Sequence, residues 1–351
     1  MKFNNSIISK RTIQYLALLL ILFLSLYLNI SCEKGTEPEQ LKPGRRDYVW
    51  TEDTLDVASY DYLLFRNIVG NTPDDIWLGT LDASYNTALW HYNGTIWKSI
   101  PFPSFAATAL LLFEDNTLWA GTKQDYIYRY ENGQLTESFK IELEGYDKIK
   151  IFDMSGETKD NIYAVGWASI SGENNDKGII LHYDGKNWSF VNIQDLGFGF
   201  SWIVYQKNIK TYFIFGTNYE NGIIDDQIFT FDGQIVEKIV SPYSSAALSK
   251  VKDIVYFNSS QKVFKYKNNN LTLWRDFSGT SFRSNFVGRS ESDFFNSAYD
   301  GLGHYNGEDF KTIYKTHLEL NGLVVFEKDV FAIAEDQNNH KYIILHGKLK
   351  E

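Results

Sequence analysis

The chain has 351 residues and a formal net charge of −10 at pH 7, from 34 basic and 44 acidic side chains. An acidic surface repels a phosphate backbone, so we do not expect nucleic acid as a partner. Aromatic residues make up 16% of the chain, and its one cysteine excludes an internal disulfide. A body of about 300 residues buries enough surface to fold without disulfides or metals. These features are typical of one large all-β domain.

The first 31 residues have the pattern of an export signal. Lys2, Lys10 and Arg11 form a basic start, and residues 12–31 carry no charge and are rich in Leu, Ile and Phe. This apolar run is also long enough to span a bilayer, so an uncleaved membrane anchor is the alternative interpretation.

Cys32 follows this run directly and precedes a polar segment that contains Pro and Gly. The arrangement resembles a bacterial lipoprotein signal, in which a small residue precedes the cysteine that receives the lipid. The resemblance implies a signal peptide over 1–31, lipidation of Cys32 and a flexible tether over 32–46. The membrane would then be a partner through the lipid anchor. An ordinary thiol near a membrane anchor is the alternative for Cys32.

The resemblance also implies a location. The protein is expected to be exported and lipid-anchored to the bacterial cell envelope. Glu33, where Asp would match an inner-membrane retention signal, points toward the outer membrane.

Residues 47–351 repeat one pattern about seven times. Its inner half is a strand such as DDIWLGT at 74–80, and its outer half is an aromatic strand with a tight turn, such as LWHYNG at 89–94. The spacing between equivalent inner positions is 42, 44, 50, 42, 40 and 36 residues, counted along Trp77, Trp119, Tyr163, Phe213, Val255, Phe295 and Phe331. This spacing is typical of one four-stranded blade per repeat, and Asn-Gly and Asp-Gly pairs fit its hairpin turns. The sequence therefore predicts an all-β, seven-bladed β-propeller.

The two ends of this region predict how the ring closes. In the last repeat the turn falls at Gly347 and the chain stops at Glu351, which leaves the outermost strand of that blade missing. The segment DYVWTEDT at 47–54 has strand character and belongs to no repeat. We therefore predict that Tyr48–Thr51 pairs with the strand around Tyr342–Leu345 and completes the last blade. An independent N-terminal extension is the alternative.

The repeats also resemble known proteins. The phrase NTLWAGTKQDYIYRYENG at 116–133 resembles the two-component regulator propeller repeat of bacterial sensor proteins. The phrases DNIYAVGW and GIILHYDGKNW are similar to repeats of bacterial propeller lipoproteins. The resemblance implies a propeller that serves as a scaffold, and it implies no signalling by this polypeptide alone.

Side chains that often carry chemistry recur here at structural positions. Equivalent positions in different blades point apart, so His91, His182 and His304 cannot converge, and we expect no metal site and no cofactor. Five acids at or near inner strands are interpreted as turn formers: Asp75, Asp160, Asp253, Asp293 and Asp329. Motifs of serine hydrolases, zinc proteases and phosphate-binding loops are absent from the sequence, so no enzyme is predicted. Sialidase-type propellers need three converging arginines, and only Arg66 and Arg283 fall on predicted inner strands, with Arg289 close to one.

Departures from the repeat predict a binding surface. Trp167 opens a long loop in the third repeat, and 195–200 and 217–226 flank the inner strand that contains Trp202. These segments are expected on one rim of the propeller, where long loops often carry recognition residues. The candidate ligand-binding residues are Trp167, Phe198, Tyr219, Glu220, Asp225 and Asp226. The alternative is that Trp167 and Phe198 cap the hydrophobic core.

Two functions follow from these observations. The first is a monomeric, non-enzymatic cell-envelope lipoprotein that acts as a ligand-binding or protein-interaction scaffold for a glycan, a peptide or an envelope protein. The second is a carbohydrate-active enzyme, lyase or hydrolase, with its active site at the mouth of the propeller channel. A hydrolase would need two carboxyl groups about 5–9.5 Å apart, such as Glu220 and Asp225.

Overall fold

The computed structural model describes residues 44–57, 63–84, 87–172, 176–220, 223–239, 247–283, 285–336 and 339–351. Within this part of the chain, Lys42–Glu351 forms one compact unit. The predicted signal peptide and Cys32 lie outside the described residues. The side chain of Glu220 is also outside them.

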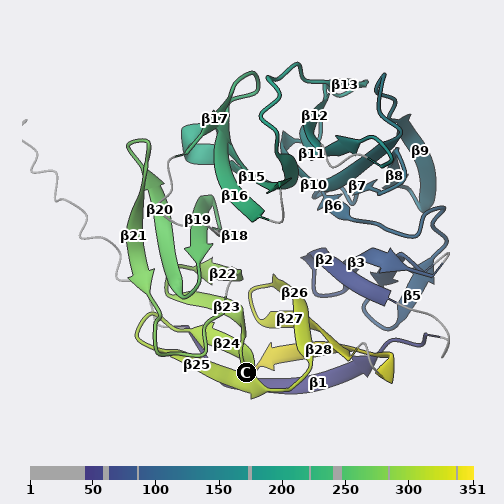
Figure 1. The fold of residues 1–351 in the computed structure, drawn as a ribbon. Coiled ribbons are helices and arrows are strands. Elements are labelled where there is room, and N and C mark those ends of the chain that lie inside the picture. The colour runs from purple at the N-terminus through teal and green to yellow at the C-terminus, as the bar shows by residue number, and fades with distance from the viewer. Residues whose placement is uncertain are drawn as a thin grey trace, which may run out of the picture. The chain divides into compact units, whose positions relative to one another are not determined.

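The described strands follow the chain in sets of four, and each set is an antiparallel sheet (Figure 1). The first two sets are β2 (Leu63–Thr72), β3 (Asp75–Ala83), β4 (Leu89–Tyr92) and β5 (Trp97–Ile100), then β6 (Ala109–Leu112), β7 (Leu118–Gly121), β8 (Tyr126–Glu131) and β9 (Gln134–Lys140). The next two are β10 (Lys148–Thr158), β11 (Asn161–Ser169), β12 (Lys177–Tyr183) and β13 (Trp188–Phe190), then β14 (Gly199–Gln206), β15 (Thr211–Glu220), β16 (Ile223–Phe231) and β17 (Val236–Lys238). A single 3₁₀ turn, η1 (Lys207–Ile209), separates β14 from β15 in the described chain.

The remaining strands complete the arrangement. Two sets join into one eight-stranded sheet through a short parallel pairing of β18 with β22: β18 (Ala247–Val251), β19 (Ile254–Ser259), β20 (Lys262–Lys267) and β21 (Asn270–Asp276), then β22 (Phe286–Ser290), β23 (Asp293–Ala298), β24 (Gly301–Tyr305) and β25 (Phe310–Lys315). The last sheet has the order β1-β28-β27-β26 and contains β26 (Glu319–Val325), β27 (Asp329–Asp336), β28 (Lys341–Leu349) and β1 (Tyr48–Thr54). The predicted all-β propeller is confirmed in its fold class. Figure 1 shows the first strand of each set innermost.

The second strand of each set is buried on both faces, which explains its unbroken apolar sequence. In β3, for example, Ile76–Thr80 is fully buried, because its sheet is packed between two neighbouring sheets. The recurring aromatic residue of this strand contacts a ring on the third strand of the next sheet. Trp77 meets Tyr130 with ring centroids 4.7 Å apart, and Trp119 meets Tyr183 at 4.8 Å. The repeat is therefore a packing pattern between blades.

The recurring histidines are structural, as predicted, and they explain the recurring acids. Nε2 of His91 lies 2.7 Å from Oδ1 of Asp75, and the same distance separates His346 from Asp329. The His91 ring also stacks on Trp77, at 4.1 Å between centroids. The same pairing recurs at His304 with Asp293 and at His182 with Asn161. Asp75, Asp293 and Asp329 thus hold histidines, a role beyond the predicted turns, whereas Asp160 and Asp253 lie in turns.

The predicted pairing of the two ends is present, but in a different register. Tyr48 lies opposite Leu349 and Thr51 opposite His346, rather than near Tyr342–Leu345. The reason is that β28 does not turn at Gly347 but continues through it. Gly347 lies opposite Trp50, whose ring atoms would stand 2.5 Å from a Cβ at that position. The glycine therefore makes room for an indole and does not bend the chain.

The predicted tether ends earlier than residue 46. The N–H of Gly44 donates to the carbonyl oxygens of Ser292 (3.1 Å) and Asn306 (3.0 Å). Arg46 donates to Oδ1 of Asp309 at 2.5 Å and to the carbonyl oxygen of His304 at 2.9 Å. Residues 44–46 are consequently part of the folded unit, bound to turns of the β22–β25 sheet.

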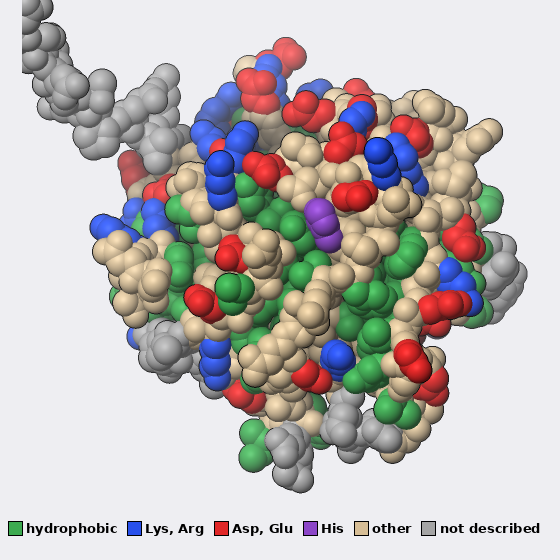
Figure 2. Space-filling model, turned by 90° about the horizontal axis from the view of Figure 1, so that it is seen from above, with side chains coloured by type: hydrophobic (Ala, Val, Ile, Leu, Met, Phe, Trp, Pro, Cys, Tyr) green, Lys and Arg blue, Asp and Glu red, His purple; other side chains and the backbone are tan. Residues whose placement is uncertain are grey.

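The outer surface carries both signs of charge. Figure 2 shows acidic and basic side chains interspersed on one side of the molecule. In the described residues, none of the helical segments is long and apolar enough to cross a bilayer.

Candidate functional site

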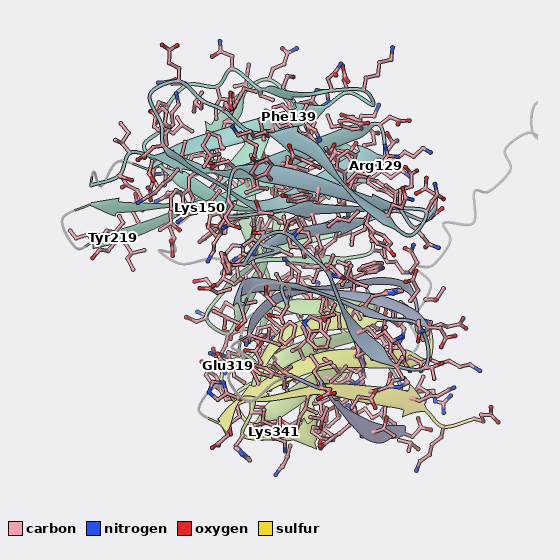
Figure 3. All side chains as sticks on the ribbon, turned by 90° about the vertical axis from the view of Figure 1, so that its right-hand side faces the viewer. Arg129, Phe139, Lys150, Tyr219, Glu319 and Lys341 are labelled. Atoms are coloured by element: carbon pink, nitrogen blue, oxygen red, sulfur yellow. The ribbon has the colours of Figure 1, made fainter. Side chains whose placement is uncertain are left out.

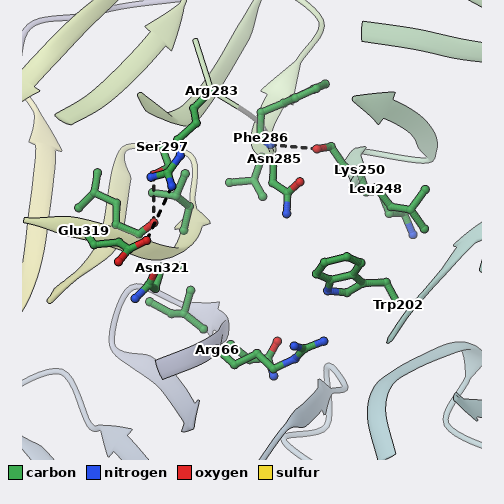
Figure 4. Close-up of a pocket in the computed structure, with 17 residues that line it drawn as sticks. Arg66, Trp202, Leu248, Lys250, Arg283, Asn285, Phe286, Ser297, Glu319 and Asn321 are labelled. Carbon is green, nitrogen blue, oxygen red and sulfur yellow. Dashed lines mark hydrogen bonds and ion pairs between the residues drawn. The ribbon is translucent and has the colours of Figure 1, made fainter. Parts of the chain in front are cut away.

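A cavity of about 450 Å³ lies among the first strands of five of the four-stranded sets (Figure 4). Its lining comes from β2, β14, β18, β26, the start of β22 with the segment before it, and Ser297 on β23. A second hollow of about 290 Å³ adjoins it and shares Arg66, Trp202, Asn285, Glu319 and Asn321. We call the two together the channel mouth. It is assembled from residues that lie more than 250 positions apart in the chain, from Arg66 to Leu323.

β-Bulges carry several of the residues at the channel mouth. In β2, Phe65 lies opposite Thr80 and Asn67 opposite Gly79, so Arg66 is an extra residue without a partner on β3. The same one-residue shift makes Phe152 the extra residue of β10, Ser201 that of β14 and Asn321 that of β26. A bulge redirects a side chain and is common beside functional sites. The same one-residue bulge therefore recurs at equivalent positions in four sheets.

Three of these bulged residues meet. Nη2 of Arg66 donates a hydrogen bond of 2.9 Å to the carbonyl oxygen of Ser201. The guanidinium carbon lies 5.3 Å from the ring centroid of Phe152 and 5.5 Å from that of Trp202. These distances are in the range of cation–π contacts, which favour a guanidinium with its face on an aromatic ring. Arg66 is therefore held in one orientation by two neighbouring sheets.

The contacts continue away from the cavity. Phe152 stacks on Trp167 with centroids 5.7 Å apart and an interplanar angle of 21°. Nζ of Lys150 lies 4.2 Å from the centroid of Trp167. Two cations and three rings thus form one row, which we call the aromatic ladder: Lys150, Trp167, Phe152, Arg66 and Trp202.

Positive charge at the channel mouth is only partly neutralised. Burial lowers the pKa of Arg66, and the attraction of Asp153 opposes that shift. Burial also lowers the pKa of Lys123, which is close enough to Arg66 and Lys150 to be repelled by both. Loss of hydration likewise lowers the pKa of Lys250 on the cavity wall. Each of these cations is attracted by one acid, Asp153, Asp82 or Asp253, but the loss of hydration outweighs that attraction.

The acids of this region have defined roles. Glu319 is the one carboxylate among the described lining residues, and it lies 3.8 Å from Nη2 of Arg283. Asp153 stands behind Arg66 and accepts the N–H groups of Ile203 and Met154, each at 2.9 Å. Burial raises the pKa of Asp153 to about 6, because these hydrogen bonds and Arg66 offset the loss of hydration incompletely.

The sequence-predicted candidates lie near this region but do not line the cavity. Trp167 does not open a loop: it lies within β11, opposite Lys150, and is half-buried. Phe198 is half-buried against Phe229, with ring centroids 5.4 Å apart, as the core-capping alternative expected. Trp167 reaches the channel mouth indirectly, through Phe152 in the aromatic ladder.

The other candidates belong to the β15–β16 hairpin. Tyr219 is 58% exposed, near the end of β15, and Asp225 is exposed on β16. Oδ1 of Asp226 accepts a hydrogen bond of 2.8 Å from the hydroxyl of Thr217. Figure 3 shows Tyr219 at the tip of a projecting hairpin, on the same side of the molecule as Lys150 and Glu319. The described members of this group are therefore a surface beside the channel mouth. Among the described residues, no group of three or more metal-ligating side chains gathers anywhere.

Sequence reasoning identified parts of the channel mouth without joining them. Arg66 and Arg283 were predicted on inner strands, and Trp202 was singled out as a departure from the repeat. Arg66 does lie on β2, but Arg283 lies in the segment before β22 and not on a strand. The bulges that bring Arg66, Phe152 and Ser201 together cannot be recognised in the pattern of apolar residues along the sequence. An arginine inside an otherwise apolar first strand was the available signal.

Comparison with protein-family models and with curated proteins finds no match at the level of sequence. Solved structures share the fold. A YCF48 structure with a bound D1 peptide is similar over 90% of this chain and 100% of its own, with a TM-score of 0.57 and 11% identity. An oligogalacturonate lyase in complex with manganese covers 89% of this chain and 99% of its own, with a TM-score of 0.59 and 8% identity.

A third similar structure is bacterial and extracellular. It is the extracellular domain of a putative one-component system from B. thetaiotaomicron, with a TM-score of 0.53 and 12% identity. The match covers 84% of this chain and 39% of that longer chain. At these identities the likeness shows a β-propeller fold, which binding proteins and enzymes share.

Proposed function

We propose that this protein is a non-enzymatic binding protein of the bacterial cell envelope and that it holds a small ligand at the channel mouth. The observation that supports this most is the set of bulged first strands, which place Arg66 and Asn321 on the wall of one hollow and Ser201 behind Arg66 as its hydrogen-bond acceptor. A pocket with a few convergent polar groups on a rigid scaffold is the usual form of a ligand site.

The cavity lining favours binding over hydrolysis. A hydrolase of the usual kind uses two carboxyl groups, one as acid and one as base or nucleophile. In the described lining the single carboxylate, Glu319, is paired with Arg283. Asn285, Asn321 and Trp202 instead offer hydrogen bonds and a ring face, which are groups suited to recognition.

The envelope location rests on the leader. A basic start, an apolar run and Cys32 in the position of a lipid acceptor support export and lipidation. Mass spectrometry of the mature N-terminus is expected to find a diacylated or triacylated Cys32. An intact leader, or a protein recovered in soluble form from wild-type cells, would reject the lipid anchor.

The point at which the N-terminal segment joins the folded unit supports one orientation of such an anchored protein. β22 runs from the cavity, at Phe286, toward the turn at Ser292, whose carbonyl oxygen accepts the N–H of Gly44. The chain that leads to Cys32 therefore joins the folded unit at the strand end remote from the cavity. A lipid tether on this side lets the channel mouth face away from the membrane.

The site is tested with defined glycans and peptides in a thermal-shift screen. Compounds that raise the melting temperature of the wild type are expected to have no effect on Trp202→Ala or Asn321→Ala. Equal shifts in both variants would place binding elsewhere. Mass spectrometry should recover the bound compound unchanged, and a cleaved product would overturn the non-enzymatic part of the proposal.

A further inference from the structure

We propose that the ligand at the channel mouth is an acidic sugar of the uronate class, with its carboxylate on Arg66 and its ring against Trp202. The inference rests on the proposed function and adds the chemistry of the ligand. It follows from the local charge, the state of Arg66 and the uncharged groups around it.

The first step is the charge. The chain as a whole is acidic, with a net charge of −10, yet three cations and one acid line the cavity: Arg66, Lys250, Arg283 and Glu319. Lys123 and Lys150 add positive charge near Arg66, and each of them is attracted by one acid, Asp82 and Asp176 respectively. A hollow with protein walls focuses such a field, so it attracts an anion from solution.

The second step is Arg66 itself. A guanidinium has five N–H donors, and in the described structure this one uses Nη2 toward Ser201. Its Nε is buried and has no hydrogen-bond partner, so the group is not fully satisfied by the protein. Phe152 and Trp202 fix its plane. A fixed planar guanidinium with donors to spare suits a carboxylate, which can accept two parallel hydrogen bonds.

The third step is the rest of the ligand. Trp202 is half-buried, and its indole forms part of the wall of both hollows. Asn285 and Asn321 also line both, and an amide can donate to one sugar hydroxyl and accept from another. Figure 4 shows these groups around the same space as Arg66. A ring with several hydroxyl groups fits this combination better than an apolar acid does.

The fourth step concerns the choice between carboxylate and phosphate. Glu319 lies at the cavity wall, is 53% exposed and stands 3.8 Å from Nη2 of Arg283. A phosphate monoester carries close to two negative charges at neutral pH, so it would be repelled more strongly by Glu319 and attracted more strongly by the three cations than a single carboxylate. The lining charge attracts both anions, and galactose 6-phosphate is therefore the competing ligand in the test.

The test is isothermal titration of the full mature domain with two matched probes. Trigalacturonate carries the carboxylates, and fully methyl-esterified trigalacturonate has the same sugar rings without charge. Trigalacturonate is expected to bind at least about tenfold more tightly, the difference that a charged hydrogen-bonded pair contributes. Arg66→Met should lower its affinity by a similar factor, and Lys98→Met, an exposed cation on β5, should not change it.

The salt dependence of binding is measured on the wild type, so this test does not require a variant to fold. Raising NaCl from about 50 mM to about 500 mM should weaken trigalacturonate binding to the wild type several-fold, since exposed charge interactions are screened. Arg66→Lys keeps the charge but loses the fork of donors, and its affinity should fall between those of wild type and Arg66→Met.

Four outcomes would overturn the inference: no binding of trigalacturonate, equal binding of acid and ester, tighter binding of galactose 6-phosphate, or a salt-independent affinity. If the ester or neutral galactotriose binds and Trp202→Ala abolishes that binding, the proposed function stands and only the acidic class is wrong. If trigalacturonate binds Trp202→Ala and Arg66→Met as tightly as it binds the wild type, both the inference and the proposed site fail.

Discussion

Charged side chains are paired with carboxylates at one end of the first strands and are left without a direct carboxylate partner at the other. At the end that receives Gly44–Arg46, cations meet carboxylates directly: Nη1 of Arg289 lies 2.9 Å from both oxygens of Asp293, and Arg46 donates to Asp309. At the channel mouth, Arg66 and Lys250 lose hydration, and no described carboxylate lies within hydrogen-bond distance of either. The paired charges at the Gly44–Arg46 end stabilise the fold, whereas we propose that the charges at the channel mouth bind a ligand.

The acids at the two ends differ in the direction of their pKa shifts. Burial alone would raise the pKa of Asp293, but hydrogen bonds from His304 and Arg289 outweigh it and leave the pKa below its usual value. Burial raises the pKa of Asp153 to about 6, because its partners are two backbone N–H groups and the more distant Arg66. The comparison shows that direct pairing, rather than burial, decides the direction of the shift.

Removing residues 47–54 is expected to have the largest effect. The segment forms β1, which supplies the outermost strand of the last sheet, with Tyr48 buried and Trp50 packed on Tyr314. Burial of two large aromatic side chains contributes on the order of 4 kcal/mol, so the free energy of unfolding in urea should fall by about that amount. The substitution Val49→Thr, on the exposed face of the same strand, serves as the control. An unchanged stability of the truncated protein would show that the end pairing is not a structural element.

Among single substitutions at the end that receives Gly44–Arg46, Asp293→Ala should lower the free energy of unfolding most. It removes the carboxylate partner of Arg289 and of the fully buried His304, and leaves Arg289 only Tyr48 and the carbonyl oxygen of Phe326 among its described acceptors. Breaking a buried pair on one side costs about 3 kcal/mol or more, which denaturant unfolding can measure. Asp309→Ala removes a half-exposed partner of Arg46 and should cost about 1 kcal/mol. Equal losses in the two variants would contradict the importance of burial here.

Asp153 should give the channel mouth its own pH dependence. Its pKa is raised in the folded state, so its contribution to stability is present below the unfolded value and is lost as pH rises through about 6. The wild type should therefore gain stability relative to Asp153→Asn as pH falls from about 7 to about 4, by at most about 3 kcal/mol. Unfolding free energies of both proteins across this range provide the measurement. A constant difference would show that Asp153 does not titrate there.

The smallest effects concern the candidates outside the cavity. Trp167→Ala removes the ring that supports Phe152 and through it Arg66, so trigalacturonate affinity should fall a few-fold, in line with about 1 kcal/mol for an aromatic contact. Tyr219→Ala, on the exposed hairpin, should change neither affinity nor stability by more than about 0.5 kcal/mol. A larger loss from Tyr219→Ala would favour the rim as the binding surface.

The repeat determined the fold because it records local packing. The recurring aromatic residue predicts a strand buried between two sheets, and Trp77 and Trp119 occupy that place. The Asn-Gly and Asp-Gly pairs predict tight turns, and Gly94 and Gly233 indeed have positive φ angles of 85° and 104°. Each of these features depends on neighbours within one repeat or the next, so the sequence alone reveals it.

The site was decided by the tertiary structure. A bulge adds one residue to a strand without disturbing the apolar pattern, so nothing in the sequence showed that Arg66, Phe152 and Ser201 would meet. The register of β28 likewise depended on Trp50, some 300 residues away, lying across Gly347. Packing of the sheets against one another brings such distant positions together, and only the packed chain specifies which side chains then share the channel mouth.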